Sequence, residues 1–313
     1  MGSFMRPRTY PPRSTGRAPV AARRGGGKKV SVTGVVVIMG VACAVAELGV
    51  ATIAIRHVAS WTSASVKCTS RADGSPWADR VAAAARTGTA HGLRVGVAIV
   101  DTATDACYTA GDTDGLFTTA SVVKVMIAAC LLDTDQMTAD TRALAYSMIT
   151  RSDDDAADTL WSRAGAAALE PWIEDHYKSP GLGSANDTPG RWGNTHVTAA
   201  GLAQLYAKLK RNPDVWPWLR DAMHHMQRFA KDGTDQRFGI PAVSPGAAVK
   251  QGWAAASADD PGDSVVNSTG YVDQDRYAVV LLTEGRKAVD GGSFNAAQAA
   301  TVTDMTRQLG LAV

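Results

Sequence analysis

The pattern of apolar and polar positions predicts strands at two places in the chain, separated by a long helical region. Two short apolar runs, at 93–100 and 107–110, are joined by a polar turn and predict a hairpin. Apolar spacing typical of helices then dominates from 116 to about 226. Strand patterns return late in the chain, at 247–253, 264–272 and 277–283.

Helical spacing also appears on both sides of these strands. It predicts one helix at 77–86 and a closing helix at 293–309. The central region contains further helical patterns at 138–149, 155–163 and 198–209. Strands at both ends with helices between them predict an α+β fold. Its antiparallel sheet is built from both ends of the domain, flanked by helices, and accompanied by an all-helical subdomain.

The N-terminal part of the chain has a different pattern. Residues 1–29 carry eight Lys or Arg and no acid, are rich in Pro and Gly, and lack apolar periodicity, which predicts a disordered basic tail. Residues 30–55 are apolar apart from four positions and are long enough to cross a bilayer. Basic residues before an apolar span predict a cytoplasmic N-terminus and an exported body.

Two forms of the export signal remain open. Ala44-Val-Ala46 before Glu47 has the small-x-small form of a cleavage site, whereas the long basic region and continued apolar residues favour an uncleaved anchor. Cys43 lacks the preceding leucine usual for lipid attachment, so we set lipidation aside. We expect a single-pass membrane protein with an extracytoplasmic domain, or a secreted one if cleavage occurs. Residues 56–78 are predicted to be a linker and 79–313 the exported domain.

Charge and cysteine content narrow the class of protein. Beyond the basic tail the chain holds 24 basic and 30 acidic residues, which argues against a nucleic-acid partner. Cys68 and Cys107 lie outside the apolar segment and are available to pair in an oxidising compartment. Cys130 falls within an apolar helical run and is predicted to be a small core residue.

One polar pair interrupts the apolar run at 118–132. Ser121 and Lys124 lie three positions apart, on one face of the predicted helix, so a hydroxyl and an amine can meet there. A lysine among apolar neighbours has a lowered pKa and can accept the serine proton. Alone, the pair is weak evidence, because Ser is usually a helix cap and Lys usually a solvated residue.

Two further motifs follow, each with an ordinary structural explanation. Ser152-Asp153-Asp154 precedes a helical pattern and could simply cap its N-terminus. Lys250-Gln251-Gly252 lies on a predicted strand, where an exposed lysine is common.

The order of the three motifs along the chain favours a catalytic interpretation over these structural explanations. Ser-x-x-Lys, then Ser-Asp-Asn, then Lys-Thr/Ser-Gly on a late strand is the signature of serine β-lactamases and penicillin-binding proteins. From about Trp77 onward the chain resembles that superfamily, and class A β-lactamase-like serine hydrolases most closely. The stretches 198–203 and 233–241 belong to the resemblance. It implies a DD-peptidase/β-lactamase-like fold and a β-lactam or peptidoglycan-derived acyl substrate.

The resemblance implies roles for individual residues. Ser121 corresponds to the acylated nucleophile and Lys124 to its base. Ser152 corresponds to the hydroxyl that relays a proton to the leaving nitrogen, and Lys250 to the cation that steers a substrate carboxylate. Backbone N–H groups of Ser121 and Trp253 correspond to the oxyanion hole.

Several substrate-binding positions depart from the family pattern. Asp154 replaces an asparagine, so it cannot donate a hydrogen bond to substrate, and its charge raises the pKa of Lys124. Gln251 replaces a small hydroxyl residue beside Gly252, and we expect Gln251 and Trp253 to narrow the cleft.

The departure in the loop before 198 has the largest consequence. Class A β-lactamases release the acyl group with water activated by a loop glutamate, in a Glu-x-x-Leu-Asn arrangement. Residues 179–194 contain no such arrangement. Counting back from the next helix places Leu182 at the glutamate position, and Asp187 is the only carboxylate in the loop. Glu170 comes earlier, on a predicted helix.

Three functions therefore compete. The first is an exported serine hydrolase or acyltransferase that is acylated at Ser121 and released slowly or by another route. The second is a catalytically weak, membrane-tethered module that binds cell-wall fragments. The third is an efficient class A β-lactamase, which the missing loop glutamate disfavours. We expect no cofactor, and no metal site, because the histidines lack ligand spacing.

Overall fold

The computed structural model describes residues 68, 75–179, 181–182, 192–255, 263–286 and 294–311. The predicted tail 1–29, the apolar segment 30–55 and most of the predicted linker lie outside these residues. Within the described ranges, no helix is both long enough and apolar enough to cross a membrane. The first helix begins at Pro76, capped by Ser75, one residue before the helix predicted at 77–86.

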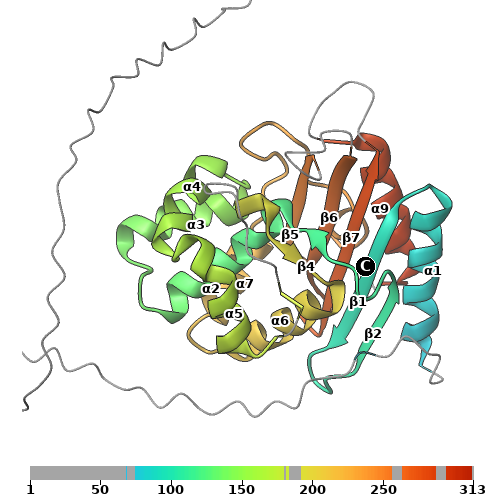
Figure 1. The fold of residues 1–313 in the computed structure, drawn as a ribbon, viewed down its shortest axis with the longest axis horizontal. Coiled ribbons are helices and arrows are strands. Elements are labelled where there is room, and N and C mark those ends of the chain that lie inside the picture. Colours follow the sequence, from blue (N-terminus) through green and yellow to red (C-terminus); the bar gives the residue numbers. More distant parts are fainter. Residues whose placement is uncertain are drawn as a thin grey trace, which may run out of the picture. The chain divides into compact units, whose positions relative to one another are not determined.

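A five-stranded antiparallel sheet forms the centre of the domain, in the order β2-β1-β7-β6-β5 (Figure 1). Its strands are β1 (Arg94–Asp101), β2 (Cys107–Gly111), β5 (Ala248–Ala255), β6 (Asp263–Val272) and β7 (Tyr277–Arg286). The early hairpin joins the late strands through β1 and β7, which pair from Arg94↔Glu284 to Asp101↔Tyr277. The sheet is therefore built from both ends of the domain, which confirms the predicted α+β fold.

Helices cover both faces of the sheet. On one face α1 (Pro76–Ala90) packs against α9 (Ala296–Gln308), β1 and β2 (Figure 1). On the other face α6 (Ala199–Arg211) packs against β1 and β7. Each face has its own apolar core, because the strands are buried on both sides.

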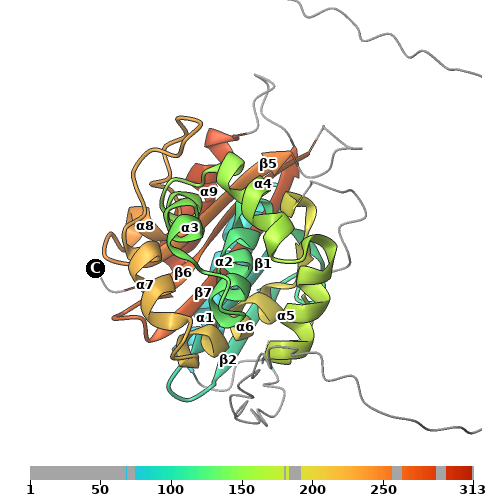
Figure 2. The same cartoon turned by 90° about the vertical axis from the view of Figure 1, so that its left-hand side faces the viewer.

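A group of helices beyond α6 forms the predicted helical region. It comprises η1 (Ala120–Val123), α2 (Lys124–Asp133), α3 (Ala139–Thr150), α4 (Asp154–Arg163), η2 (Ala166–Ala168), α5 (Leu169–Tyr177), η3 (Trp192–Asn194) and α7 (Trp216–His224). The short helix α8 (Ile240–Val243) packs instead against α9 and β6. In Figure 2, α2 runs through the middle of this group, with α3, α4, α5 and α7 around it. Residues Lys124 to Leu132 of α2 are all buried, so α2 has no solvent-facing stripe.

The predicted helix at 118–132 is divided in the structure. Ala120 has a left-handed backbone conformation, with φ 46°, and the 3-10 turn η1 follows before α2 begins. Two-residue strands β3 (Phe117–Thr118) and β4 (His196–Val197) pair just before this turn. Continuous apolar spacing could not reveal the break, because 3-10 and α-helical turns bury the same residues here.

The cysteines are arranged as the sequence allowed. Cys68 and Cys107 form a disulfide, which ties the chain before α1 to the first residue of β2. Cys130 is buried in α2, as predicted, and burial raises the pKa of its thiol to about 11. A buried thiol with a raised pKa is unreactive.

Candidate active site

Ser121 lies in the turn η1, which is held against the sheet. Asn267 on β6 donates hydrogen bonds from Nδ2 to the carbonyl oxygens of Thr118 and Thr119, at 2.8 Å and 3.2 Å. The Thr119 N–H donates to the carbonyl of Thr195 at 2.8 Å. The turn therefore has backbone contacts on two sides, which fix the position of Ser121.

Strand β5 approaches this turn closely at Gly252. A Cβ atom at Gly252 would lie 2.7 Å from the carbonyl oxygen of Thr119 and 3.3 Å from the nitrogen of Ser121. Only glycine permits this approach without displacing backbone atoms. The contact places the strand that carries Lys250 beside the turn that carries Ser121.

Lys124 is completely buried at the start of α2. Its ammonium donates to the Asp154 carboxylate at 2.5 Å, to the Ser152 carbonyl at 2.9 Å and to the Ser152 hydroxyl at 3.4 Å. Burial lowers the pKa of Lys124, and the negative charge of Asp154 opposes that shift. The net direction is downward, which favours a neutral amine.

Ser121 and Lys124 are not joined directly. Across the described ranges, no hydrogen bond links the Ser121 hydroxyl to the Lys124 ammonium, which is turned toward Ser152 and Asp154. Their spacing along the chain allowed the two groups to meet. A carboxylate accepts a stronger hydrogen bond from an ammonium than a hydroxyl does, and this explains the orientation.

Ser152 is the point where two buried lysines converge. Its Oγ accepts from Lys250 Nζ at 2.9 Å and lies 3.4 Å from Lys124 Nζ. Lys250 is fully buried, and burial, with the neighbouring positive charge of Lys124, holds its pKa well below the ordinary value. Ser152 has a left-handed backbone, with φ 52°, a costly conformation of the kind concentrated at functional sites.

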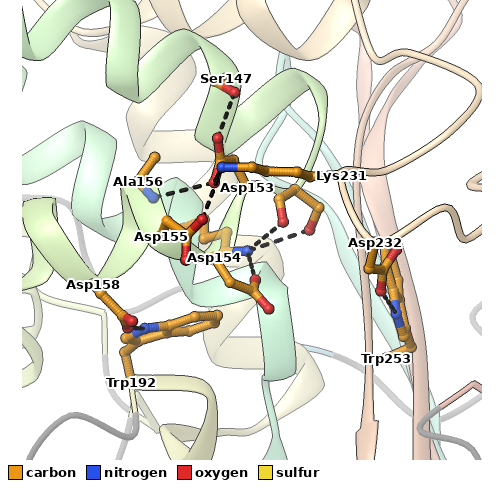
Figure 3. Close-up of polar contacts among 12 residues, drawn as sticks. Ser147, Asp153, Asp154, Asp155, Ala156, Asp158, Trp192, Lys231, Asp232 and Trp253 are labelled. Atoms are coloured by element: carbon orange, nitrogen blue, oxygen red, sulfur yellow. Dashed lines mark hydrogen bonds and ion pairs between the residues drawn. The ribbon is translucent and has the colours of Figure 1, made fainter. Parts of the chain in front are cut away.

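Asp153 fulfils the structural role that the sequence allowed for this motif. It is the N-cap of α4, and its carboxylate accepts from the Ala156 N–H at 3.2 Å. Ser147 and Lys231 also donate to this carboxylate, each at 2.8 Å, as Figure 3 shows. These bonds lower the pKa of Asp153 despite its burial. The cap therefore holds the neighbouring Ser152 in place.

Gln251 and Trp253 do not narrow the cleft. The Gln251 amide is fully buried and donates to the carbonyls of Phe238 and Gln236, at 2.6 Å and 3.4 Å. The Trp253 ring packs beside Phe238 and Phe294, in the core on the α1 and α9 side. Successive strand residues point to opposite faces, so residues beside Gly252 point away from Ser121.

The open part of the site is a cavity of about 310 Å³, lined by Ser152, Asp154, Asp155, Lys231 and Asp232. Asp154 is 68% exposed here, although its partner Lys124 is buried. Asp232 accepts from the Trp253 indole at 3.2 Å, and its charge acts on both buried lysines. The entrance to the site is therefore rich in carboxylates.

Sequence reasoning missed Trp192 and Asp232. The Trp192 ring lies 4.6 Å from Lys124 Nζ, and its indole N–H donates to Asp158 at 2.7 Å (Figure 3). Neither residue belongs to one of the three motifs, so the motifs gave no signal for them.

Within the part of the chain that the structure describes, no group of three or more His, Cys, Asp or Glu side chains is arranged to hold an ion.

Solved structures share this fold at low sequence identity. A β-lactamase from Chitinophaga pinensis matches 72% of this chain and 96% of its own, at 14% identity and a TM-score of 0.55. The TLA-3 extended-spectrum β-lactamase matches the same shares at 12% identity and a TM-score of 0.56. The domain thus has the fold of class A β-lactamases.

Sequence comparisons define the family. The profile of the β-lactamase enzyme family (Beta-lactamase2) matches residues 133–311. "Putative lipoprotein LppW" of Mycobacterium tuberculosis and of Mycobacterium bovis is 31% identical over 244 residues, covering 74% of each chain. This chain belongs to the β-lactamase enzyme family, a family of serine hydrolases.

Proposed function

We propose that the protein is an exported serine hydrolase that forms an acyl-enzyme at Ser121 with a β-lactam or a peptidoglycan-like amide. The observation that carries the proposal is the convergence of Lys124 and Lys250 on Ser152, beside the turn that bears Ser121. Two buried amines with lowered pKa values around one hydroxyl provide a path for proton transfer.

The acylation step follows from these groups. Neutral Lys124 takes the proton of the Ser121 hydroxyl as its oxygen attacks the substrate carbonyl. The backbone N–H groups of Ser121 and Trp253 stabilise the oxyanion, a contribution of about 3–4 kcal/mol per donor. The C–N bond then breaks, and Lys124 returns its proton to the leaving nitrogen through the Ser152 hydroxyl, which Lys250 orients.

We propose that release of the acyl group is slow or uses a different base. Residues 178–197 contain no glutamate, so the water-activating residue typical of class A enzymes is missing from this loop. Leu182, at the expected glutamate position, is a buried apolar residue bridged to Val197. An apolar side chain cannot activate water.

Covalent labelling tests the proposal. Incubation of the purified protein with a fluorescent penicillin should give a labelled band that is lost in Ser121→Ala and strongly reduced in Lys124→Ala. A label that persists in Ser121→Ala would show that another residue reacts. Rapid turnover of a chromogenic cephalosporin would favour an efficient class A β-lactamase and would contradict slow release.

One observation favours a second candidate, a catalytically weak module that binds cell-wall fragments. The 2.5 Å ion pair between Lys124 and Asp154 stabilises the charged amine, which cannot act as a base. Equal binding of a muropeptide by the wild type and Ser121→Ala, with no turnover of any acyl substrate, would support this module.

We further propose that the domain acts outside the cytoplasm, attached to the membrane through residues 30–55. The relatives' name, which includes "lipoprotein", supports attachment of this kind and returns Cys43 to consideration. Metabolic labelling with a fatty-acid analogue, compared between the wild type and Cys43→Ala, distinguishes a lipid anchor from an uncleaved apolar segment.

A further inference from the structure

Glu170 is a buried carboxyl group that the proposed mechanism does not use. It is the second residue of α5 and is 2% exposed. Its Oε1 accepts a hydrogen bond from the Thr195 hydroxyl at 2.6 Å. Among the described residues no cation pairs with it, and its Oε2 has no hydrogen-bond partner.

Burying a carboxyl group that lacks a full set of hydrogen-bond partners lowers the stability of the folded protein. An unpaired carboxylate is poorly solvated in an apolar interior, and burial accordingly raises the pKa of Glu170. A buried oxygen without a partner adds to this cost. Apolar packing does not explain a glutamate at this position of α5.

The partner of Glu170 leads to the nucleophile. The Thr195 carbonyl accepts from the Thr119 N–H at 2.8 Å, two residues before Ser121. The Thr195 N–H donates to the carbonyl of Trp192 at 3.1 Å and closes the turn η3. One short segment, 192–195, thus connects Glu170 to the turn that bears Ser121.

The same segment contacts the base. The ring of Trp192 lies against the Lys124 ammonium, at 4.6 Å from the ring centroid. The space beside Gly193 is bounded by the backbone of Ala120, since a Cβ atom there would lie 3.7 Å from its Cα. Movement of 192–195 would therefore alter the surroundings of both Ser121 and Lys124.

We propose that Glu170 is a positioning residue for acylation. Its hydrogen bond to Thr195 holds segment 192–195 against η1 and α2, so that Ser121 and Lys124 keep the geometry needed for attack. Glu170 acts through Thr195 and does not touch the substrate. This inference rests on the proposed function, because it assigns a role in acylation at Ser121.

The test uses variants of the full chain that remove or preserve the one hydrogen bond. Glu170→Ala and Thr195→Val remove it, whereas Glu170→Gln keeps an acceptor oxygen and Thr195→Ser keeps the donor hydroxyl. Glu174→Gln is the matched control, since Glu174 lies one turn later on α5 and is partly exposed. The rate constant of acylation and the dissociation constant are measured separately with a fluorescent penicillin.

We expect Glu170→Ala and Thr195→Val to slow acylation at saturating penicillin by roughly tenfold, the effect of about one hydrogen bond on a barrier. The dissociation constant should stay within about twofold, because neither residue is assigned to substrate binding. The double variant should be no slower than either single variant, because both remove the same bond. Glu170→Gln and Thr195→Ser should retain most of the rate.

A merely structural role gives a different result. It would lower the melting temperature while leaving the acylation rate of folded molecules unchanged, and that outcome overturns the proposal. If Glu170→Ala does not fold, the comparison of Thr195→Val with Thr195→Ser tests the same hydrogen bond.

A second readout separates this inference from the proposed function. If the wild type forms no adduct with any penicillin, the proposed function fails, and amide hydrogen exchange at Thr119 then decides the positioning role. Faster exchange of this N–H in Glu170→Ala and Thr195→Val, but not in Glu174→Gln, supports the role. Unchanged exchange rules it out.

Discussion

Lys124 is subject to two opposing electrostatic effects. Burial lowers its pKa, and the Asp154 carboxylate at 2.5 Å raises it. The neutral amine is the form that can accept a proton from Ser121, so acylation should increase as the pH rises through the pKa of Lys124. Asp154 keeps that pKa higher than burial alone would set it. In the proposed mechanism, the carboxylate thus limits Lys124 as a base at neutral pH.

Substitution of Asp154 should release this limit. Asp154→Asn removes the negative charge, so the pKa of Lys124 falls further and the ascending limb of the acylation rate against pH moves to lower pH. At pH 7 we expect acylation to accelerate by roughly three- to tenfold. Stopped-flow measurement with a fluorescent penicillin from pH 5 to pH 9 checks this result.

The control for this prediction is Asp140→Asn, which makes the same charge change in the exposed first turn of α3. Its pH profile should match that of the wild type. If the ascending limb of the pH profile of Asp154→Asn stays in place or moves to higher pH, Asp154 does not lower the basicity-limited rate by raising the pKa of Lys124.

Some site residues could be predicted at this scale and others could not. Ser121, Lys124, Ser152 and Lys250 belong to motifs whose order constrains their meeting in space. Glu170 was expected on a helix, but its burial and its link to Thr195 depend on how that helix packs. Neither can be derived from spacing along one chain.

At the scale of elements, the site depends on the approach of β5 to η1. The sequence predicted the strand from its apolar pattern but expected a continuous helix where η1 lies. The structure confirms both strand groups and the closing helix. The sequence did not predict that Gln251 and Trp253 face the second core. Both strand faces are buried here, so the pattern lacks the alternation that would have distinguished them.

Gly252 tests this approach directly. Gly252→Ala places a methyl group against the Thr119 carbonyl and the Ser121 nitrogen, and backbone atoms cannot move aside as a flexible side chain can. We expect a loss of about 1–3 kcal/mol in the free energy of unfolding, as is usual for overpacking. Acylation should also slow strongly.

Gly246→Ala is the matched control, because a Cβ atom there has no heavy atom within 4 Å. Urea denaturation and penicillin labelling of both variants give the comparison. Equal stability and equal labelling of the two variants would show that β5 tolerates displacement from η1.

At the scale of the whole molecule, the sheet joins two apolar cores, and the disulfide ties Cys68 to the first residue of β2. Cys68 and Cys107 are 39 residues apart, and their bond closes a loop that contains α1 and β1. The sequence indicated that the two cysteines were available to pair. The pairing itself could not be predicted, because it depends on how α1 and the β1–β2 hairpin bring the two cysteines together.

Loss of this disulfide should reduce stability without removing the site. A cross-link over a loop of this length contributes about 3–4 kcal/mol through the entropy of the unfolded chain. Cys68→Ser/Cys107→Ser should show that loss in urea denaturation and should still be labelled by penicillin when folded. Reductant should destabilise the wild type alone. Equal destabilisation of the double variant by reductant would contradict this assignment.

The central claim is that Ser121 is acylated and releases its acyl group slowly. Intact-mass spectrometry of the purified protein, followed over time with a penicillin and with an acyl-D-Ala ester, measures both steps together. We predict a mass increase equal to the bound acyl group, which persists after free substrate is removed and is absent from Ser121→Ala. No adduct with any acyl substrate, or the same adduct on Ser121→Ala, would contradict the account.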